Sequence, residues 1–231
     1  MTQTERTLED STVDTVLNVI RKRIILGEYP PNSKIMPKQI AEDCGTSFIP
    51  VREALRVLES EGFVSFVHNR GAWVTPLSLS DLEDLYTIRL ELECEAVRRA
   101  TVMTDDELSE VEAALDEADR AAHAGNQSRV IEINRVFHFA LYAKANSPRR
   151  LKLIEQLWMH SARYQRLALI HRDDAADGEH RLILTAMANG DHGTAADALR
   201  DHLETTVTLV RERCRELVTL DDGRSPEMSA N

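Results

Sequence analysis

Three histidines in the C-terminal half of the chain have a spacing that would suit a shared metal ion. Asn134 and His138 are four residues apart, so both side chains would lie on one face of a helix. His180 and His202 fall on two further expected helices, separated by the Gly190-Asp191 turn. If these helices are antiparallel neighbours, the four side chains can meet in one cavity. Three neutral imidazoles and one amide oxygen would then leave open positions on a divalent ion for a ligand.

The alternative interpretation treats each histidine as a partly buried helix residue with one hydrogen bond, which is the usual role of a single histidine. Spacing alone leaves both interpretations open for His138, His180 and His202. The other histidines of the C-terminal half are assigned the structural role: His123, His160, His171 and His192.

A second candidate site is a helix with two arginines on its polar face, in the segment TSFIPVREALRVLESEG. Arg52 and Arg56 lie four residues apart, on the face opposite Val51, Leu55 and Leu58. An arginine can donate two hydrogen bonds to guanine, or a charge-assisted bond to phosphate. This face therefore suits the major groove of DNA.

Two neighbouring features fit the same interpretation. Ser47 and the first N–H groups of the helix would suit a phosphate, and the turn His68-Asn69-Arg70-Gly71 could reach an adjacent minor groove. In the alternative, the two arginines pair with Glu53 and Glu59 on a solvated helix face.

The elements around these arginines predict a winged helix-turn-helix. Apolar residues at helical spacing indicate three helices, each ended by a glycine or a loop, and two β-prone runs then flank a polar turn. This is the order helix, helix, helix, hairpin. The expected elements are helices over 13–24, over 37–44 and from Ser47 to Gly62, and strands over 63–67 and 72–75.

Beyond residue 78 the pattern is helical throughout and predicts an antiparallel all-α bundle. Ser80 with Glu83, and Thr104 with Glu107, have the spacing of capping boxes at two helix starts. The expected helices run from Ser80 to about Ala100, from Thr104 to Gly125, and over 127–145, 148–171, 175–189 and 194–217. The fold class is therefore mainly α, with one small β-hairpin.

The net charge of −11 over 231 residues argues against a protein that coats nucleic acid with its whole surface, and against a polybasic membrane binder. It leaves room for a small DNA-reading domain. Residues 15–76 contain eight Lys and Arg against six Asp and Glu, so this segment carries +2 and the rest of the chain −13.

The cysteines and the first residues indicate a cytoplasmic protein. Cys44, Cys94 and Cys214 are odd in number and far apart, which favours neither a disulfide framework nor a zinc–thiolate site. The segment 1–10 is polar, and no window approaches the ~18 apolar residues of a membrane span. We expect no export and no membrane contact.

Residues 13–75 resemble the winged helix-turn-helix of the GntR superfamily of transcription factors. The likeness lies in LGEYPPNSKI, in IAEDCGTSFIPVREALRVLESEGFV and in NRGAWV. It implies a role in binding a double-stranded DNA operator. The residues to which we assign DNA contacts are Lys38, Ser47, Phe48, Arg52, Arg56, His68, Asn69, Arg70 and Gly71.

Phe48 departs from this family, whose members usually carry Arg after the Ser of the turn. Phenylalanine cannot donate to a phosphate or to guanine, although it could touch a thymine methyl group. The operator sequence of relatives is therefore not transferable to this chain.

Residues 79–218 resemble the FadR-type C-terminal ligand-binding domain, called FCD, of the same regulators. The likeness lies in R-x-x-L-E from Arg89 to Glu93, in F-H at His138, in E-H at His180, and in a G-D turn followed by His202. The resemblance implies a divalent metal held by three histidines and an Asp, whose position Asn134 occupies here. An amide supplies no negative charge, so we expect a weaker or altered site that suits Zn²⁺ or Ni²⁺.

The resemblance also implies a small organic acid as the effector. Arg89 is a natural partner for a carboxylate, although helical spacing favours an ion pair with Glu93. Arg163 and Tyr164 are further candidates for the cavity wall.

The leading function is a ligand-responsive repressor that binds a near-palindromic operator as a homodimer. The alternatives are a metal-dependent hydrolase, whose base Glu179 should point away from His180, and an architectural DNA binder without an effector. The expected domains are a flexible lead (1–10), the DNA-binding domain (11–75), a linker (76–80), the effector domain (81–218) and a flexible tail (219–231).

Overall fold

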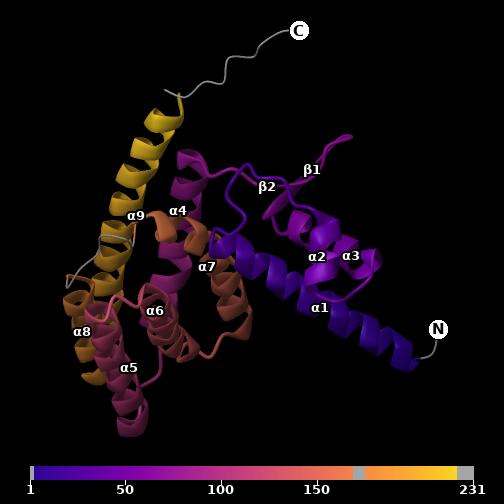
Figure 1. The fold of residues 1–231 in the computed structure, drawn as a ribbon. Helices are drawn as coiled ribbons and strands as arrows, with labels where there is room; N and C mark the ends of the chain where they lie inside the picture. Colours follow the sequence, from indigo (N-terminus) through magenta and orange to yellow (C-terminus); the bar gives the residue numbers. More distant parts are fainter. Residues whose placement is uncertain (1–2, 169–174, 223–231) are drawn as a thin grey trace. The chain divides into compact units, whose positions relative to one another are not determined.

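The computed structural model describes residues 3–168 and 175–222. The chain divides into two compact units, Met1–Leu77 and Ser78–Asn231. The first is a winged helix-turn-helix with a two-stranded hairpin and the second is a helical bundle, so the expected fold class is confirmed (Figure 1). Among the described helices, none combines the length and the apolar character needed to cross a membrane.

The N-terminal unit contains the expected three helices and hairpin. The helix α1 begins at Gln3, so it includes residues 3–10 of the expected flexible lead. The antiparallel strands pair Val64 with Val74 and Val67 with Gly71. The elements are α1 (Gln3–Ile25), α2 (Pro37–Asp43), α3 (Phe48–Ser60), β1 (Val64–Val67) and β2 (Gly71–Val74).

The helix α3 is held by its apolar face and presents its polar face to solvent. Val51, Ala54, Leu55 and Leu58 are fully buried, at the spacing of three and four that the sequence predicts. The chain turns into α3 through Gly45, whose φ of +59° is a conformation that favours glycine. Burial of one face thus aims the opposite face of α3 outward.

Two ion pairs connect α1 to the ends of α2 and α3. The Arg21 guanidinium donates to the Glu61 carboxylate at 2.7 Å, at the end of α3, and Arg23 donates to Asp43 at 2.6 Å, at the end of α2. Hydrogen bonds from Gln39 and from Arg23 lower the pKa of Asp43. These two arginines therefore serve the fold of the N-terminal unit.

The C-terminal unit is a bundle of six described helices. The helix α9 packs against α4, α7 and α8, and α5 packs against α6 and α8. His171, where the helix that begins at Pro148 was predicted to end, lies outside the described residues. The same holds for residues 223–231 of the expected tail. The helices are α4 (Leu79–Arg98), α5 (Asp105–His123), α6 (Gln127–Ala143), α7 (Pro148–Ala168), α8 (Ala175–Ala188) and α9 (His192–Asp222).

One of the two predicted capping boxes is confirmed and the other is wrong. Thr104 and Glu107 form the expected reciprocal pair at the start of α5. The cap of α4 is Ser78, whose hydroxyl accepts a hydrogen bond from the Asp81 N–H at 3.1 Å, and Ser80 already lies in the first turn. The segment S-L-S-D holds a second cap pattern two residues earlier, and the extended backbone at Ser78 selects it.

We predict that Ser78→Ala lowers the stability of the protein by about 1 kcal/mol, because the mutation removes the side-chain cap of α4. The melting temperature should fall by about 2–4 °C in thermal unfolding of the full chain. Ser80→Ala is the matched control and should leave the melting temperature unchanged. A larger loss in Ser80→Ala than in Ser78→Ala would contradict this assignment.

Candidate metal centre and nucleic-acid interface

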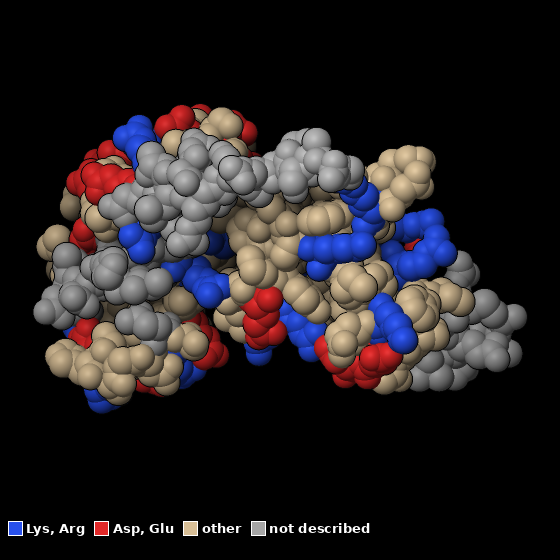
Figure 2. Space-filling view, turned by 45° about the horizontal axis from the view of Figure 1, so that its top comes forward, with Lys and Arg blue, Asp and Glu red and all other residues tan. Residues whose placement is uncertain are grey.

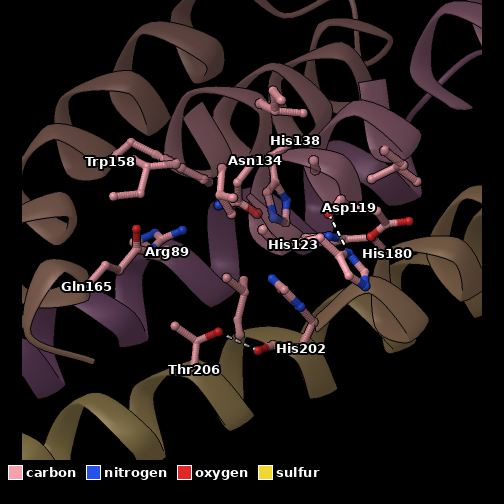
Figure 3. A pocket seen from close by; sticks show the side chains of 17 residues that line it. Arg89, Asp119, His123, Asn134, His138, Trp158, Gln165, His180, His202 and Thr206 are labelled. Carbon is pink, nitrogen blue, oxygen red and sulfur yellow. Dashed lines mark hydrogen bonds between the residues drawn. The ribbon is translucent and has the colours of Figure 1, made fainter. Parts of the chain in front are cut away.

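A cavity in the C-terminal unit is lined by side chains from all six of its described helices (Figure 3). Its wall is polar where α4, α7 and α9 contribute Arg89, Gln165 and Thr206. It is apolar along α5 and α6, where Leu115, Ala118, Ala122, Val130, Ile131 and Ile133 line it. The cavity therefore offers both a polar and an apolar wall to a ligand.

The three predicted histidines meet in this cavity. His138 comes from α6, His180 from α8 and His202 from α9, and one ligand nitrogen of each lies within 4.8 Å of the others. All three are buried, and their ring centroids are 4.6–5.1 Å apart. Asn134 lines the same cavity beside His138 (Figure 3). A triad of buried, convergent imidazoles has the chemistry to hold a borderline divalent metal ion.

Glu179 does not line the cavity with His180, as expected for neighbouring residues of one helix, yet it contacts the triad through His202. Its carboxylate oxygen lies 2.7 Å from Nδ1 of His202. The helix α9 packs against α8, which brings Nδ1 of His202 to the Glu179 carboxylate. The carboxylate therefore supports a histidine of the triad from behind, which is a common arrangement at metal sites.

Arg89 forms the ion pair that helical spacing predicts. Its Nε donates to the Glu93 carboxylate at 2.6 Å, and both side chains are fully buried. Burial alone lowers the pKa of the Arg89 guanidinium, and the charge of Glu93 outweighs this, so the pKa lies above its usual value. The guanidinium also lies over the rings of Tyr86 and Trp158, at 4.7 and 4.9 Å from their centroids.

Part of Arg89 remains available to the cavity. Among the described residues, its Nη1 has no hydrogen-bond partner although it is buried, and the same holds for Nε1 of Trp158. Both residues line the cavity. Buried donors without an acceptor are costly, so the cavity is suited to a ligand that brings acceptor oxygens.

Arg163 and Tyr164 do not line this cavity, so their assignment to its wall is corrected. The helix α7 presents Trp158 and Gln165 to the cavity, seven residues apart and on one face, while positions 163 and 164 turn to other sides. The Tyr164 hydroxyl donates to Asp81 at 2.5 Å, near the start of α4.

Sequence reasoning missed two residues of the site. His123 lines the cavity, although it was assigned a structural role, and its Nδ1 lies 2.8 Å from the Asp119 carbonyl oxygen. Tyr142 stands behind the wall, where its hydroxyl donates to Glu93 at 2.5 Å and lies 3.1 Å from Nδ1 of His138. The spacing of four between His138 and Tyr142 was the available signal.

All nine residues predicted to contact DNA are exposed on the N-terminal unit. Arg56 forms an ion pair with Glu53 at 3.3 Å, as the alternative interpretation expects, whereas Arg52 has no ion pair within the described part of the chain. Ser47 stands at the N-cap of α3 without a side-chain hydrogen bond to the helix. Figure 2 shows Lys and Arg side chains over the visible face of this unit.

The first turn of α3 is apolar at its tip. Phe48 is 52% exposed, and Ile49, which is not among the nine predicted contacts, is 68% exposed. Exposed apolar side chains contribute little to the stability of the fold. Their presence at the start of α3 is consistent with a surface that contacts the apolar edges of bases.

We predict that Glu93→Gln destabilises the protein by about 3–5 kcal/mol, because it leaves the buried charge of Arg89 without its counterion. Glu95→Gln is the matched control two residues away, since Glu95 pairs with Arg99 near the surface and should cost about 1 kcal/mol or less. Thermal unfolding of the full chain measures both. Equal losses in the two variants would refute a special role for the buried pair.

Comparison with known proteins gives two family matches and several relatives. Residues 12–74 match the bacterial regulatory proteins of the gntR family, and residues 84–205, more than half of the chain, match the FCD domain. The HTH-type transcriptional regulator McbR of Escherichia coli K12 is 32% identical over 145 residues, which are 62% of this chain and 66% of McbR. The HTH-type transcriptional repressor GlaR of the same strain is 25% identical over 216 residues, 84% of this chain and 93% of GlaR.

Solved structures agree with these matches. The structure of E. coli McbR/YncC superimposes with a TM-score of 0.78 at 26% identity, over 87% of this chain and 98% of that one. A GntR-type putative transcriptional regulator from Rhodococcus sp. RHA1 superimposes with a TM-score of 0.75 at 27% identity, over 87% and 97% of the two chains. With its two domains matched in order, the chain belongs to the GntR family of DNA-binding transcriptional regulators and carries an FCD domain.

Proposed function

We propose that this regulator is a repressor that binds a near-palindromic operator as a homodimer and responds to an organic acid bound in its FCD domain. The main support is that the exposed polar face of α3 belongs to the N-terminal unit, whereas the cavity with the three histidines belongs to the C-terminal unit. The repressor GlaR, which is similar over most of its length, supports the direction of control. One recognition helix offers few base contacts, and two half-sites multiply the affinity.

The DNA contacts are proposed for the exposed side of α3, the start of α2 and the hairpin tip. Arg52, without an ion pair in the described residues, is available for guanine or phosphate. Phe48 and Ile49 are suited to thymine methyl groups. Ser47 is suited to a phosphate. The remaining proposed contacts are Lys38, Arg56, His68, Asn69, Arg70 and Gly71.

Arg52→Ala should abolish specific operator binding while the melting temperature stays near that of the wild type. Each lost bidentate contact costs about 1–3 kcal/mol, and a symmetric dimer loses two. A duplex selected from a random library with the wild-type protein provides the operator, and fluorescence anisotropy measures the affinity. Arg99→Ala, an exposed arginine of α4's end, is the control. Wild-type affinity in Arg52→Ala would remove α3 from its assigned role.

The metal centre is proposed as Zn²⁺ or Ni²⁺ held by His138, His180 and His202, with the Asn134 amide oxygen as a further donor. The support is the convergence of the three ring nitrogens in a buried site. A bound metal ion would supply a Lewis-acidic position for an acceptor oxygen of the effector. The neutral donor set leaves the full ionic charge to attract an anion.

His180→Ala should lower the bound Zn²⁺ or Ni²⁺ from about one ion per chain to a small fraction of that. The measurement is elemental analysis of the full chain after loading and dialysis. His192→Ala, at the start of α9 and not in the cavity wall, should retain the wild-type content. Equal metal content in wild type and His180→Ala would eliminate the site.

The effector is proposed as a carboxylate with an apolar body. Among the described residues, Arg89 Nη1 and Trp158 Nε1 have no acceptor, which a carboxylate would supply. The apolar wall from α5 and α6 suits a hydrocarbon chain or ring. By linkage, such an effector must bind the DNA-competent and DNA-incompetent states unequally. We propose that this difference is transmitted through the expected linker 76–80, which leads from the DNA-binding domain into the first turn of α4.

A thermal-shift series from acetate to octanoate, with benzoate, tests the ligand class. Longer and aromatic acids should raise the melting temperature more than acetate. The matched alcohols should not, because they lack the carboxylate to which the Arg89 guanidinium can donate. Shifts should fall in the presence of a chelator. Acids that change DNA affinity would exclude an architectural binder, and hydrolysis of esters without DNA binding would favour the hydrolase and overturn the repressor.

A further inference from the structure

A continuous hydrogen-bonded chain connects two residues of the cavity wall through the interior of the FCD domain. Arg89 donates to Glu93 at 2.6 Å, Tyr142 donates to Glu93 at 2.5 Å, and the Tyr142 oxygen lies 3.1 Å from Nδ1 of His138. All four side chains are at most 1% exposed. Arg89 and His138 line the cavity, whereas Glu93 and Tyr142 do not. The two linking residues therefore act from behind the wall.

The chemistry of these groups allows one direction of hydrogen bonding. Glu93 is paired with a guanidinium and accepts hydrogen bonds only, so the single hydroxyl hydrogen of Tyr142 must go to Glu93. The Tyr142 oxygen can then only accept, and the hydrogen it accepts must be on Nδ1 of His138. The unprotonated nitrogen of His138 is consequently Nε2, which carries the lone pair that a metal ion needs.

His202 is set by a second carboxylate in the same way. Its Nδ1 lies 2.7 Å from a Glu179 oxygen, which accepts a hydrogen bond and leaves Nε2 of His202 as the ligand nitrogen. Two carboxylates thus favour the Nδ1–H tautomer in two histidines. Glu179 acts directly on His202, and Glu93 acts on His138 through Tyr142.

We propose that Tyr142, held by Glu93, is a positioning residue that fixes the Nδ1–H tautomer of His138 and so prepares the metal centre, as Glu179 does for His202. The inference rests on the proposed metal centre for its purpose, but the tautomer itself is a property of the metal-free protein. Tyr142 does not line the cavity, so it would not contact a ligand bound there. Its contribution is to present Nε2 of His138 without a rearrangement when the ion binds.

The experiment compares wild type, Tyr142→Phe and Tyr164→Phe in the full chain. Tyr164 is the matched control, because it is a buried tyrosine of the same domain whose hydroxyl also donates to a carboxylate, that of Asp81. Nitrogen-15 NMR of the histidine rings in metal-free protein reports the tautomer. Competition with a chromophoric chelator gives the Zn²⁺ and Ni²⁺ affinities, and thermal unfolding confirms that each variant is folded.

The wild type and Tyr164→Phe should show His138 with its hydrogen on Nδ1, and Tyr142→Phe should shift it toward Nε2. Metal affinity should fall about 10–100-fold in Tyr142→Phe and stay unchanged in Tyr164→Phe. Glu179→Ala, at a partly exposed position, should lower the affinity by a similar factor and serves if Tyr142→Phe does not fold.

Two results would overturn the inference: wild-type His138 with its hydrogen on Nε2, or metal affinities of both Tyr142→Phe and Glu179→Ala within twofold of the wild type. Failure of the proposed metal centre looks different. In that case the wild type binds neither ion, while the tautomer of His138 in the metal-free protein still decides whether Tyr142 positions it.

Discussion

The buried ion pair between Arg89 and Glu93 is the constraint on which the geometry of the FCD cavity depends. Two charges without access to water are tolerated only where hydrogen bonds and nearby rings compensate for lost hydration. Both ions lie on α4. The compensating groups come from two other helices, namely the Tyr142 hydroxyl from α6 and the Trp158 ring from α7. Satisfying one pair of charges therefore places the side chains that surround the candidate metal centre.

The chain keeps its charge in two differently organised units. In the N-terminal unit, Arg21 and Arg23 are used inside the fold, where they bind α1 to the ends of α3 and α2. Two of the eight basic side chains of residues 15–76 are therefore engaged within the fold, while the net charge of +2 is unchanged. In the proposed homodimer, specific DNA binding depends on a few well placed contacts from each of two N-terminal units, which limits binding to unrelated sequences.

Local patterns predicted the helices and strands well and failed where a neighbouring helix decides. The apolar spacing of α3 and the capping box of α5 need only residues within one or two turns, and both were confirmed. The predicted cap of α4 was wrong because Ser78 and Ser80, two residues apart, both have a sequence that suits the N-cap position. Arg163 and Tyr164 were misplaced, and the contact of Glu179 with His202 was not predicted, because the partners come from other helices, which no helical wheel contains.

The sequence by itself determined the family, the order of the elements, the three histidines and the ion pair at helical spacing from Arg89 to Glu93. These follow from short-range periodicity and from motifs that are contiguous in the chain. Only the tertiary structure decided that the histidines converge, that Tyr142 and Glu179 stand behind them, and that one buried donor of Arg89 has no acceptor among the described residues. The physical reason is that a hydrogen-bond partner across a helix interface depends on packing and axial register, and a single sequence does not encode either locally.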